Sequence, residues 1–456
     1  MTNTTRQDGL QTLFDDYDVG VPRFNVYVGM AERGNTREAS VETWSKDLVE
    51  QERERIRGRL YRQTNDNERP SESDLVPLAG PWGDEAGQRT NDVISVTFTD
   101  NVLADGPLTQ VQVEVHNVYD PQKQRFRYSD VPSDGAGDRY PILDYGRALV
   151  LEMGYRDRVD VVFSGMIEKV DLSFPADGAP TITATAVDER WRLRANRPAQ
   201  PATWDRAATE ESVAADVVAA AGLRLVTRGQ TTTINGQPRR STDQDLATFL
   251  TERARNASLE LSTLGEILFL LPPADGRTTE ALTYRYRGGL ISFSPSFNAS
   301  GCPSRVELRW RDRTRGVTLR GEADLEALRA ADLISEGDPT LTFLRQPPEN
   351  GTDGEGRVER VTNIAADDTD DANTKALGIL KRYVDAVFTA TGELLGDPRV
   401  RAGTTLDLQG LGRYSGLYYL TSTTHTFGEG GYHTSFQARR TTTPAEPTTA
   451  TESEAS

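Results

Sequence analysis

The sequence predicts a mainly β protein with a small α/β insertion, because one β-module occurs twice and a helix-containing stretch separates the copies. In the first copy, Gly146–Asp188, the residues Val170, Leu172 and Phe174 alternate with polar neighbours. This period of two is typical of strands with one buried face. Asp177-Gly178 then forms a turn into another alternating run. We therefore expect three or four successive antiparallel strands in this stretch.

The second copy of the module begins at Gly403 and keeps the same order. A strand is expected at Thr404–Gln409, and Tyr414-Ser415-Gly416 stands where the first copy has Phe163-Ser164-Gly165. A glycine turn at Gly428–Gly431 then leads into a last alternating strand. The duplication predicts two antiparallel β-domains of similar construction.

The first β-domain is predicted at residues 21–200, after a flexible polar arm at 1–20. Its early strands are expected at 21–29, 93–98 and 111–117, where apolar and polar residues alternate. A charged insertion occupies about residues 38–90. A solvated helix and loop is the ordinary interpretation of such a stretch, and an arm that grips a neighbouring subunit is the alternative.

Residues 201–285 are predicted to form a small inserted α/β domain. Thr209 is placed to cap one helix, which Gly222 ends, and Thr242 is placed to cap a second helix with Asp245 three residues on. A hairpin is expected at 259–271, where two prolines end it.

The second β-domain is predicted at residues 286–440, with a helical insertion at about 321–390. Strands at 290–293 and 305–310 are expected to precede the second module as the early strands precede the first. Residues 441–456 contain Thr, Pro, Glu, Ala and Ser only, so a disordered tail is expected.

Composition limits the classes of function. A net charge of −17 argues against specific nucleic-acid binding, which needs clustered Lys and Arg. Cys302 is the one cysteine, so no intramolecular disulfide can form. The sequence has no export signal and no apolar run long enough to span a membrane. We expect a soluble chain made in the cytoplasm, without membrane insertion.

Motifs of catalysis and of metal or phosphate binding are absent. The three histidines, His116, His425 and His433, have no spacing that predicts a zinc site, and the last two are expected at partly exposed strand positions, where they could face each other across the last hairpin. The sequence has no G-x-S-x-G and no phosphate-binding loop. We assign no catalytic, cofactor-binding or metal residue and expect no enzyme and no cofactor; interface residues stay unassigned.

The order of several short motifs across residues 21–440 resembles one known family. The motifs are Gly154-Tyr155, Phe163-Ser164-Gly165 with Ile167, Ala186–Asp188, Asp245–Pro273, Trp310-Arg311-Asp312, Gly396-Asp397-Pro398, Ala402-Gly403, Tyr414-Ser415-Gly416, Tyr418, His425, Gly431-Tyr432 and Thr434. In this order they resemble the late control D family, the baseplate hub proteins of contractile phage tails and injection systems, which includes the N-terminal part of the valine-glycine repeat proteins.

The resemblance implies two tail-tube-like β-barrels in each chain. A homotrimer would then form a ring of six similar barrels that joins a sixfold tail tube to a threefold spike. The expected partners are the tail tube protein, a separate spike protein, and a baseplate wedge or tape-measure protein, within a phage tail or injection-system particle assembled from chains made in the host cytoplasm.

Two other functions remain open from the sequence. A tail-tip cell-wall hydrolase would show a clustered acid pair in a cleft within 201–285. A carbohydrate-binding adhesin would place Trp82, Trp204 and Trp310 along one exposed groove, whereas we expect Trp310 in a core.

Overall fold

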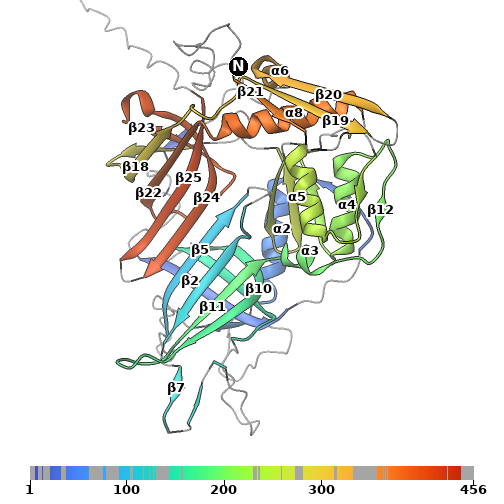
Figure 1. The fold of residues 1–456 in the computed structure, drawn as a ribbon. Coiled ribbons are helices and arrows are strands. Elements are labelled where there is room, and N and C mark those ends of the chain that lie inside the picture. Colours follow the sequence, from blue (N-terminus) through green and yellow to red (C-terminus); the bar gives the residue numbers. More distant parts are fainter. Residues whose placement is uncertain are drawn as a thin grey trace, which may run out of the picture.

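The computed structural model describes residues 6–8, 13, 21–31, 37–60, 75–78, 92–102, 106–116, 118–122, 124–126, 128–129, 143–155, 158–229, 234, 237–257, 259–272, 281–312, 316–331, 357–362, 364, 366, 368–428 and 430–442. Two β-domains, called barrel I and barrel II below, stand one above the other, and a helix-containing region lies beside them (Figure 1). The predicted tail beyond residue 442 and most of the predicted N-terminal arm lie outside the described residues.

Barrel I is a curved antiparallel sheet in the strand order β5-β6-β11-β10-β9-β2-β4. Its strands are β2 (Pro22–Met30), β4 (Val76–Leu78), β5 (Val93–Asn101), β6 (Gln110–Val115), β9 (Arg147–Tyr155), β10 (Arg158–Ser173) and β11 (Thr181–Asp188). A short hairpin of β7 (Tyr119–Asp120) and β8 (Arg125–Phe126) extends from it. Alternate side chains of the strands point inward and form one buried apolar core, as their period of two requires.

Barrel II is a closed barrel of six strands in the order β17-β18-β22-β25-β24-β23, in which β23 pairs back with β17. The strands are β17 (Ala281–Tyr286), β18 (Gly289–Phe297), β22 (Phe388–Leu395), β23 (Thr405–Gln409), β24 (Gly416–Gly428) and β25 (Gly431–Thr442), with a 3-10 turn, η1 (Gly412–Tyr414), before β24. From the predicted N-terminal arm, β1 (Arg6–Asp8) pairs in parallel with β17.

The predicted fold class, mainly β with two barrel domains and a small α/β domain, is confirmed. The two barrels share one 14-stranded sheet because β24 of barrel II pairs with β5 of barrel I.

The α/β domain has a four-stranded sheet in the order β15-β16-β13-β3. Its elements are β3 (Val41–Thr43), α2 (Lys46–Arg57), α3 (Trp191–Ala195), β12 (Ala202–Thr203), α4 (Glu210–Ala220), β13 (Arg224–Thr227), β14 (Arg239–Arg240), α5 (Leu246–Asn256), β15 (Glu260–Leu264) and β16 (Ile267–Leu271). The Thr209 cap of α4 is confirmed, since its hydroxyl accepts a hydrogen bond from the Ser212 N–H. The Thr242 cap is wrong: Asp245 caps α5, because the first apolar residue of that helix directly follows it.

The charged insertion contributes to this domain. β3 pairs in parallel with β13, and Leu48 and Val49 of α2 pack on the sheet. At the other end of α2, Ile56 packs with Tyr27 and Val150 of barrel I. The segment 41–57 therefore joins the α/β domain to barrel I within one chain.

A second insertion, in barrel II, forms a separate three-stranded sheet in the order β20-β19-β21. It contains β19 (Arg305–Asp312), β20 (Val317–Asp324), β21 (Val358–Val361), α6 (Leu325–Ala330) and α8 (Thr369–Asp385). The expectation that 305–310 belongs to the barrel is wrong. The alternating pattern of 305–310 has another cause: Val306 and Leu308 are the apolar residues that pack against α8.

Candidate functional site

Six strands follow in the same order along the chain and around the sheet in both barrels, while β4 of barrel I has no counterpart among the described strands of barrel II. The pairs equivalent by position are β2 and β17, β5 and β18, β6 and β22, β9 and β23, β10 and β24, and β11 and β25. Strand direction differs in the first pair, because β2 is antiparallel to β9 whereas β17 is parallel to β23. The duplication therefore extends beyond the module that the sequence shows.

Irregularities in the strands fix this equivalence residue by residue. A bulge in β10 at Glu168 matches a bulge in β24 at Thr421. Just before β9 and β23, Gly146 and Gly403 have φ of 81° and 85°, a region that favours glycine. Their N–H groups donate to Ile167 O at 2.9 Å and to Leu420 O at 2.8 Å. Residues 169–174 of barrel I therefore correspond to residues 422–427 of barrel II.

A second pair of bulges aligns the strands β5 and β18. The ladder of β5 with β6 shifts at Ile94, and the ladder of β18 with β22 shifts at Ile291. Residues 96–101 of β5 consequently correspond to residues 293–298 at and just after β18.

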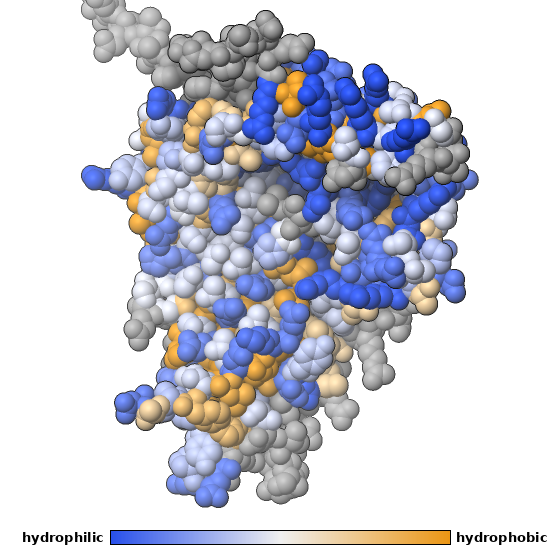
Figure 2. All heavy atoms as spheres, viewed as in Figure 1, coloured by the Kyte–Doolittle hydropathy of each residue, from blue (hydrophilic) through white to orange (hydrophobic). Residues whose placement is uncertain are grey.

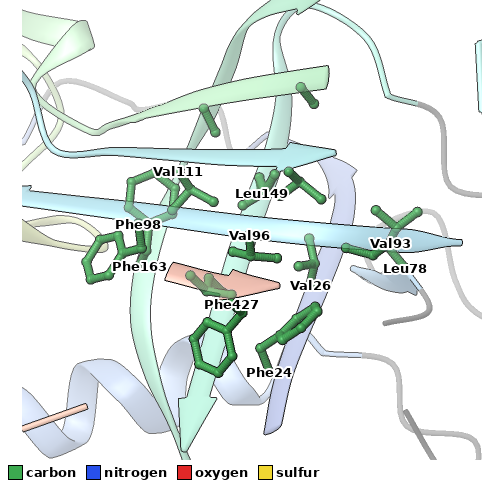
Figure 3. Packing of buried hydrophobic residues seen from close by; sticks show 14 of the residues in the cluster. Phe24, Val26, Leu78, Val93, Val96, Phe98, Val111, Leu149, Phe163 and Phe427 are labelled. Atoms are coloured by element: carbon green, nitrogen blue, oxygen red, sulfur yellow. The ribbon is translucent and has the colours of Figure 1, made fainter. Parts of the chain in front are cut away.

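The joint between the barrels is an antiparallel ladder between residues 422–427 of β24 and 96–101 of β5. His425 lies opposite Phe98, and Phe427 lies opposite Val96. The side chains of His425 and Phe427 are fully buried. Phe427 enters the core of barrel I and lies edge-on to Phe24 of β2, with ring centroids 5.2 Å apart (Figure 3). Barrel II thus completes the core of barrel I.

His425 is the polar centre of this joint. Its Nε2 donates to the Val400 carbonyl at 3.0 Å, so Nδ1 is the acceptor for the hydroxyl groups of Tyr432 at 2.9 Å and Thr434 at 3.1 Å. Burial, reinforced by the charge of Arg401, lowers the pKa of His425 to about 3. The expectation of a partly exposed position is wrong for His425. His433 pairs with Thr426 on the other face of the hairpin, so the two histidines do not face each other.

The variant His425→Gln should remove an acid sensitivity of this joint. Because the folded-state pKa lies below the ordinary value of 6.5, the unfolded chain gains a proton below pH 6.5 that the folded chain does not take. Between pH 7.5 and pH 5, wild type should lose roughly 2 kcal/mol of stability relative to the variant. Urea unfolding of both proteins at each pH measures the difference, and parallel pH profiles would contradict the buried neutral imidazole.

A chain of buried polar contacts ties the two barrels to the α/β domain. Arg401 Nε donates to Asp100 at 2.7 Å, and the Thr109 hydroxyl donates to the other oxygen of Asp100 at 3.2 Å. The backbone N–H of Thr109 donates to Asp188 at 3.0 Å, and Asp188 forms an ion pair with Arg190 at 2.7 Å. Arg190 Nη1 then donates to the Leu261 carbonyl of β15 at 3.3 Å.

Two further contacts hold the loop after β22. The Tyr155 hydroxyl of barrel I donates to the Gly396 carbonyl at 2.5 Å. Asp397 is fully buried and accepts from the Tyr284 hydroxyl and from Arg399, whose Nη2 lies 2.7 Å away. The loop thus fixes barrel II against the end of β9.

Glu260 of β15 forms another link, because it accepts a hydrogen bond from the Tyr419 hydroxyl of β24. Burial raises the pKa of Glu260 to about 7, although Tyr419 and Arg439 favour the charged form. The ionised carboxylate is therefore poorly stabilised in this position at neutral pH.

The variant Glu260→Gln should stabilise the folded chain in alkaline solution. The folded-state pKa lies above the ordinary 4.5, so the penalty for the charge accumulates between pH 4.5 and 7 and is constant above pH 7. We expect the variant to be about 3 kcal/mol more stable than wild type at pH 8 and close to it near pH 4.5. Denaturant titrations at the two pH values test this, and a variant less stable at pH 8 would show that the charge helps the fold.

One face of the shared sheet is polar and rich in hydroxyl groups. Directly paired residues share a face, and one such row runs across five strands through Ser292, Glu393, Ser435, Thr424 and Thr99. The Thr99 and Thr424 hydroxyls lie 3.3 Å apart across the joint. Neighbouring rows on this hydroxyl face contain Ser294, Thr391, Gln437 and Ser422, and Thr426, Thr97, Gln112, Thr185 and Lys169.

The segments equivalent to the two strands of the joint lie at the outer ends of the two barrels, and they carry exposed apolar side chains. On the β10 segment, Leu172 is 42% exposed and Phe174, which follows the strand, is 63% exposed, whereas their equivalents His425 and Phe427 are buried. On β18, Phe297 is 39% exposed, and Ile291, which lies at the bulge before the equivalent segment, is 47% exposed. In Figure 2 apolar side chains gather over the lower part of barrel I, while the face over α6 and β20 is strongly hydrophilic.

The structure offers little support for the two rival functions. A cavity of about 400 Å³ lies between the loop 106–108 and the helices α3 and α5, and its lining includes Arg190, Arg194 and Arg255 but one carboxylate, Glu252. It therefore lacks an acid pair. Trp204 stacks on Phe249 in the α/β core and Trp310 packs against the α8 cluster, so they line no common groove; Trp82 lies outside the described residues.

No group of three or more His, Cys, Asp or Glu residues that could hold a metal ion is found among the described residues. In the same part of the chain, no helix has the length and apolar character needed to cross a membrane.

The fold of this chain is similar to that of two solved tail proteins. The 43 kDa tail protein of prophage MuSo2 from Shewanella oneidensis matches with a TM-score of 0.55 at 10% identity, over 78% of this chain and 96% of that chain. A tail protein from Neisseria meningitidis MC58 matches with a TM-score of 0.53 at 12% identity, over 78% of this chain and 94% of that chain. No protein-family model and no curated protein sequence matches the chain. At these identities the likeness shows the fold.

Proposed function

We propose that the chain is a structural hub of a contractile tail or injection system, in which three copies form a ring of six barrels. One side of the ring matches the sixfold tail tube, and the other presents threefold symmetry to a separate spike protein. The likeness to tail proteins supports a structural role in such a particle. A tape-measure or wedge protein is a further proposed neighbour.

The observation that carries the proposal is the joint between two equivalent barrels. One chain contains two equivalent barrels and one joint, made by β24 of barrel II and β5 of barrel I. The equivalent strands at the two outer ends, β10 and β18, carry exposed apolar residues. A heterologous contact of this kind either closes into a ring or continues as a filament. Closure after three chains gives six barrels.

The hydroxyl face supports the assignment of a channel through this ring. Its Ser, Thr and Gln side chains are polar but mostly uncharged, and the whole chain is strongly acidic, with a net charge of −17. Such a surface offers no basic groove to hold a phosphate backbone. We infer that this face lines the channel and lets DNA or a protein pass without being held. In this function the chain supports the particle and catalyses no reaction.

Mass measurement of the purified chain, combined with imaging of the assembled particle, tests the proposal. We expect three copies per ring at the junction between tube and spike. Six copies or one copy in that ring would refute the symmetry argument. Release of fragments from peptidoglycan by the pure chain would refute the purely structural role and favour the hydrolase alternative.

A further inference from the structure

We propose that residues 169–174 of one copy pair with residues 293–298 of the next copy, in the same antiparallel register as the joint inside the chain. This inference rests on the proposed ring and identifies its contact: a second copy of this chain, through β10 and β18. It derives from the internal equivalence of the two barrels.

Both segments have an edge open to a partner among the described residues. The pairing of β10 with β9 ends at Met166, so residues 169–173 pair with β11 on one side only, and Phe174 follows the last of these pairs. β18 pairs with β22 along its length but with β17 only at Gly289 and Leu290. An unpaired strand edge is a ready template for another strand.

The register follows from the ladder inside the chain. There, Ser422 lies opposite Asn101, His425 opposite Phe98, and Phe427 opposite Val96. Replacing each residue by its equivalent gives Lys169 opposite Asn298, Leu172 opposite Pro295, and Phe174 opposite Phe293 of the second copy. The intervening pairs are Val170 with Phe297, Asp171 with Ser296, and Ser173 with Ser294.

The chemistry of the inferred pairs agrees with this register on both faces. Val170, Leu172 and Phe174 meet only apolar residues, and Leu172, Phe174 and Phe297 would cover their exposed surface. Lys169, Asp171 and Ser173 meet only uncharged polar residues and extend the hydroxyl face. A slip of one residue would place each apolar side chain opposite a polar one and turn it to the wrong face.

Pro295 limits how freely this edge can pair. It has no N–H group, so one bond of the ladder is absent at its position, and proline in a strand is confined to edges and irregular positions. The specific contact must therefore depend on the apolar side chains as well as on the backbone. We therefore expect the β18 edge to pair with another copy of this chain in preference to an unrelated strand.

Engineered cysteines test the register directly. In a Cys302→Ala background, Asp171→Cys with Ser296→Cys should form a disulfide between copies on mild oxidation, because directly opposed residues lie about 4.5 to 5.5 Å apart. The matched pair Asp171→Cys with Ser292→Cys is four residues out of register, about 13 Å along the strand. We expect covalent dimers and closed trimers on a non-reducing gel from the first pair and monomers from the second.

A second test uses substitutions on opposite faces of one strand. Leu172→Asp should raise the concentration needed for half-assembly at least about tenfold, whereas Ser173→Asp should change it by less than about threefold. Both positions are exposed in the single chain, so thermal melting of each variant should match wild type and show that folding is intact.

The outcomes separate this inference from the proposed function. Three copies by mass without the in-register crosslink, or with the out-of-register crosslink alone, would overturn the strand pairing and leave the trimeric hub standing. A strictly monomeric chain at all concentrations would overturn both. Equal weakening by Leu172→Asp and Ser173→Asp would show that the apolar face is not the contact.

Discussion

Replacing Asp188 with alanine should destabilise the folded chain by about 3 to 5 kcal/mol, because it leaves Arg190 buried without its counter-charge. Asp188 is 1% and Arg190 4% exposed, and their nitrogen and oxygen atoms lie 2.7 Å apart. Asp188 also accepts the N–H of Thr109, so the variant cuts the polar chain between barrel II, barrel I and the α/β domain. Urea unfolding of the single chain measures the loss.

The matched control for this prediction is Asp171→Ala. Asp171 also pairs with a basic residue two positions away, Lys169 at 2.7 Å, but the two side chains are 53% and 65% exposed. An exposed pair contributes at most about 1 kcal/mol, because water and salt screen it. A similar loss from both aspartates would mean that burial of the Asp188 pair is not what makes it important. Limited proteolysis should also show the α/β domain released earlier in Asp188→Ala than in the control.

The elements that followed from sequence are those with a local signal. The alternating runs and turn glycines of the module predicted β10, β11, β24 and β25, and Thr209 predicted the start of α4. Each of these depends on side chains close together in the chain. The module also indicated the duplication from which the joint is derived.

The elements that sequence missed depend on contacts distant in the chain. The pattern at 305–310 fits a barrel strand and a strand against α8 equally well, and the position of α8 decides between them. A neutral buried His425 could not be told from an exposed one, because its partner Phe98 lies far away in sequence. The sequence does contain one signal for this position, the alignment of Leu172 with His425 and of Phe174 with Phe427. That alignment can be made only when the bulges at Glu168 and Thr421 are known, and these are visible only in the strand pairing of the structure.

The equivalent residues Phe427 and Phe174 should lose very different amounts of folding free energy on the same substitution. Phe427 is fully buried between Phe24 and Tyr432, whose ring stacks on it at 4.0 Å, so Phe427→Ala should cost about 3 to 5 kcal/mol of folding free energy in the single chain. Phe174 is 63% exposed, so Phe174→Ala should cost less than about 1 kcal/mol there. Unfolding at a concentration too low for assembly measures both.

The two substitutions should also differ in whether they affect the association of copies or the folding of the single chain. Phe174→Ala should weaken association of copies while its unfolding curve stays close to wild type, because within the chain its ring meets Phe126 but stays 63% exposed, and the next copy would cover the rest. Phe427→Ala should weaken the chain itself, since its ring fills a core that both barrels share. If Phe174→Ala assembles as wild type does, the outer end of barrel I does not form a contact between copies that resembles the joint inside the chain. If Phe427→Ala unfolds as wild type does, the two barrels do not depend on each other for their cores.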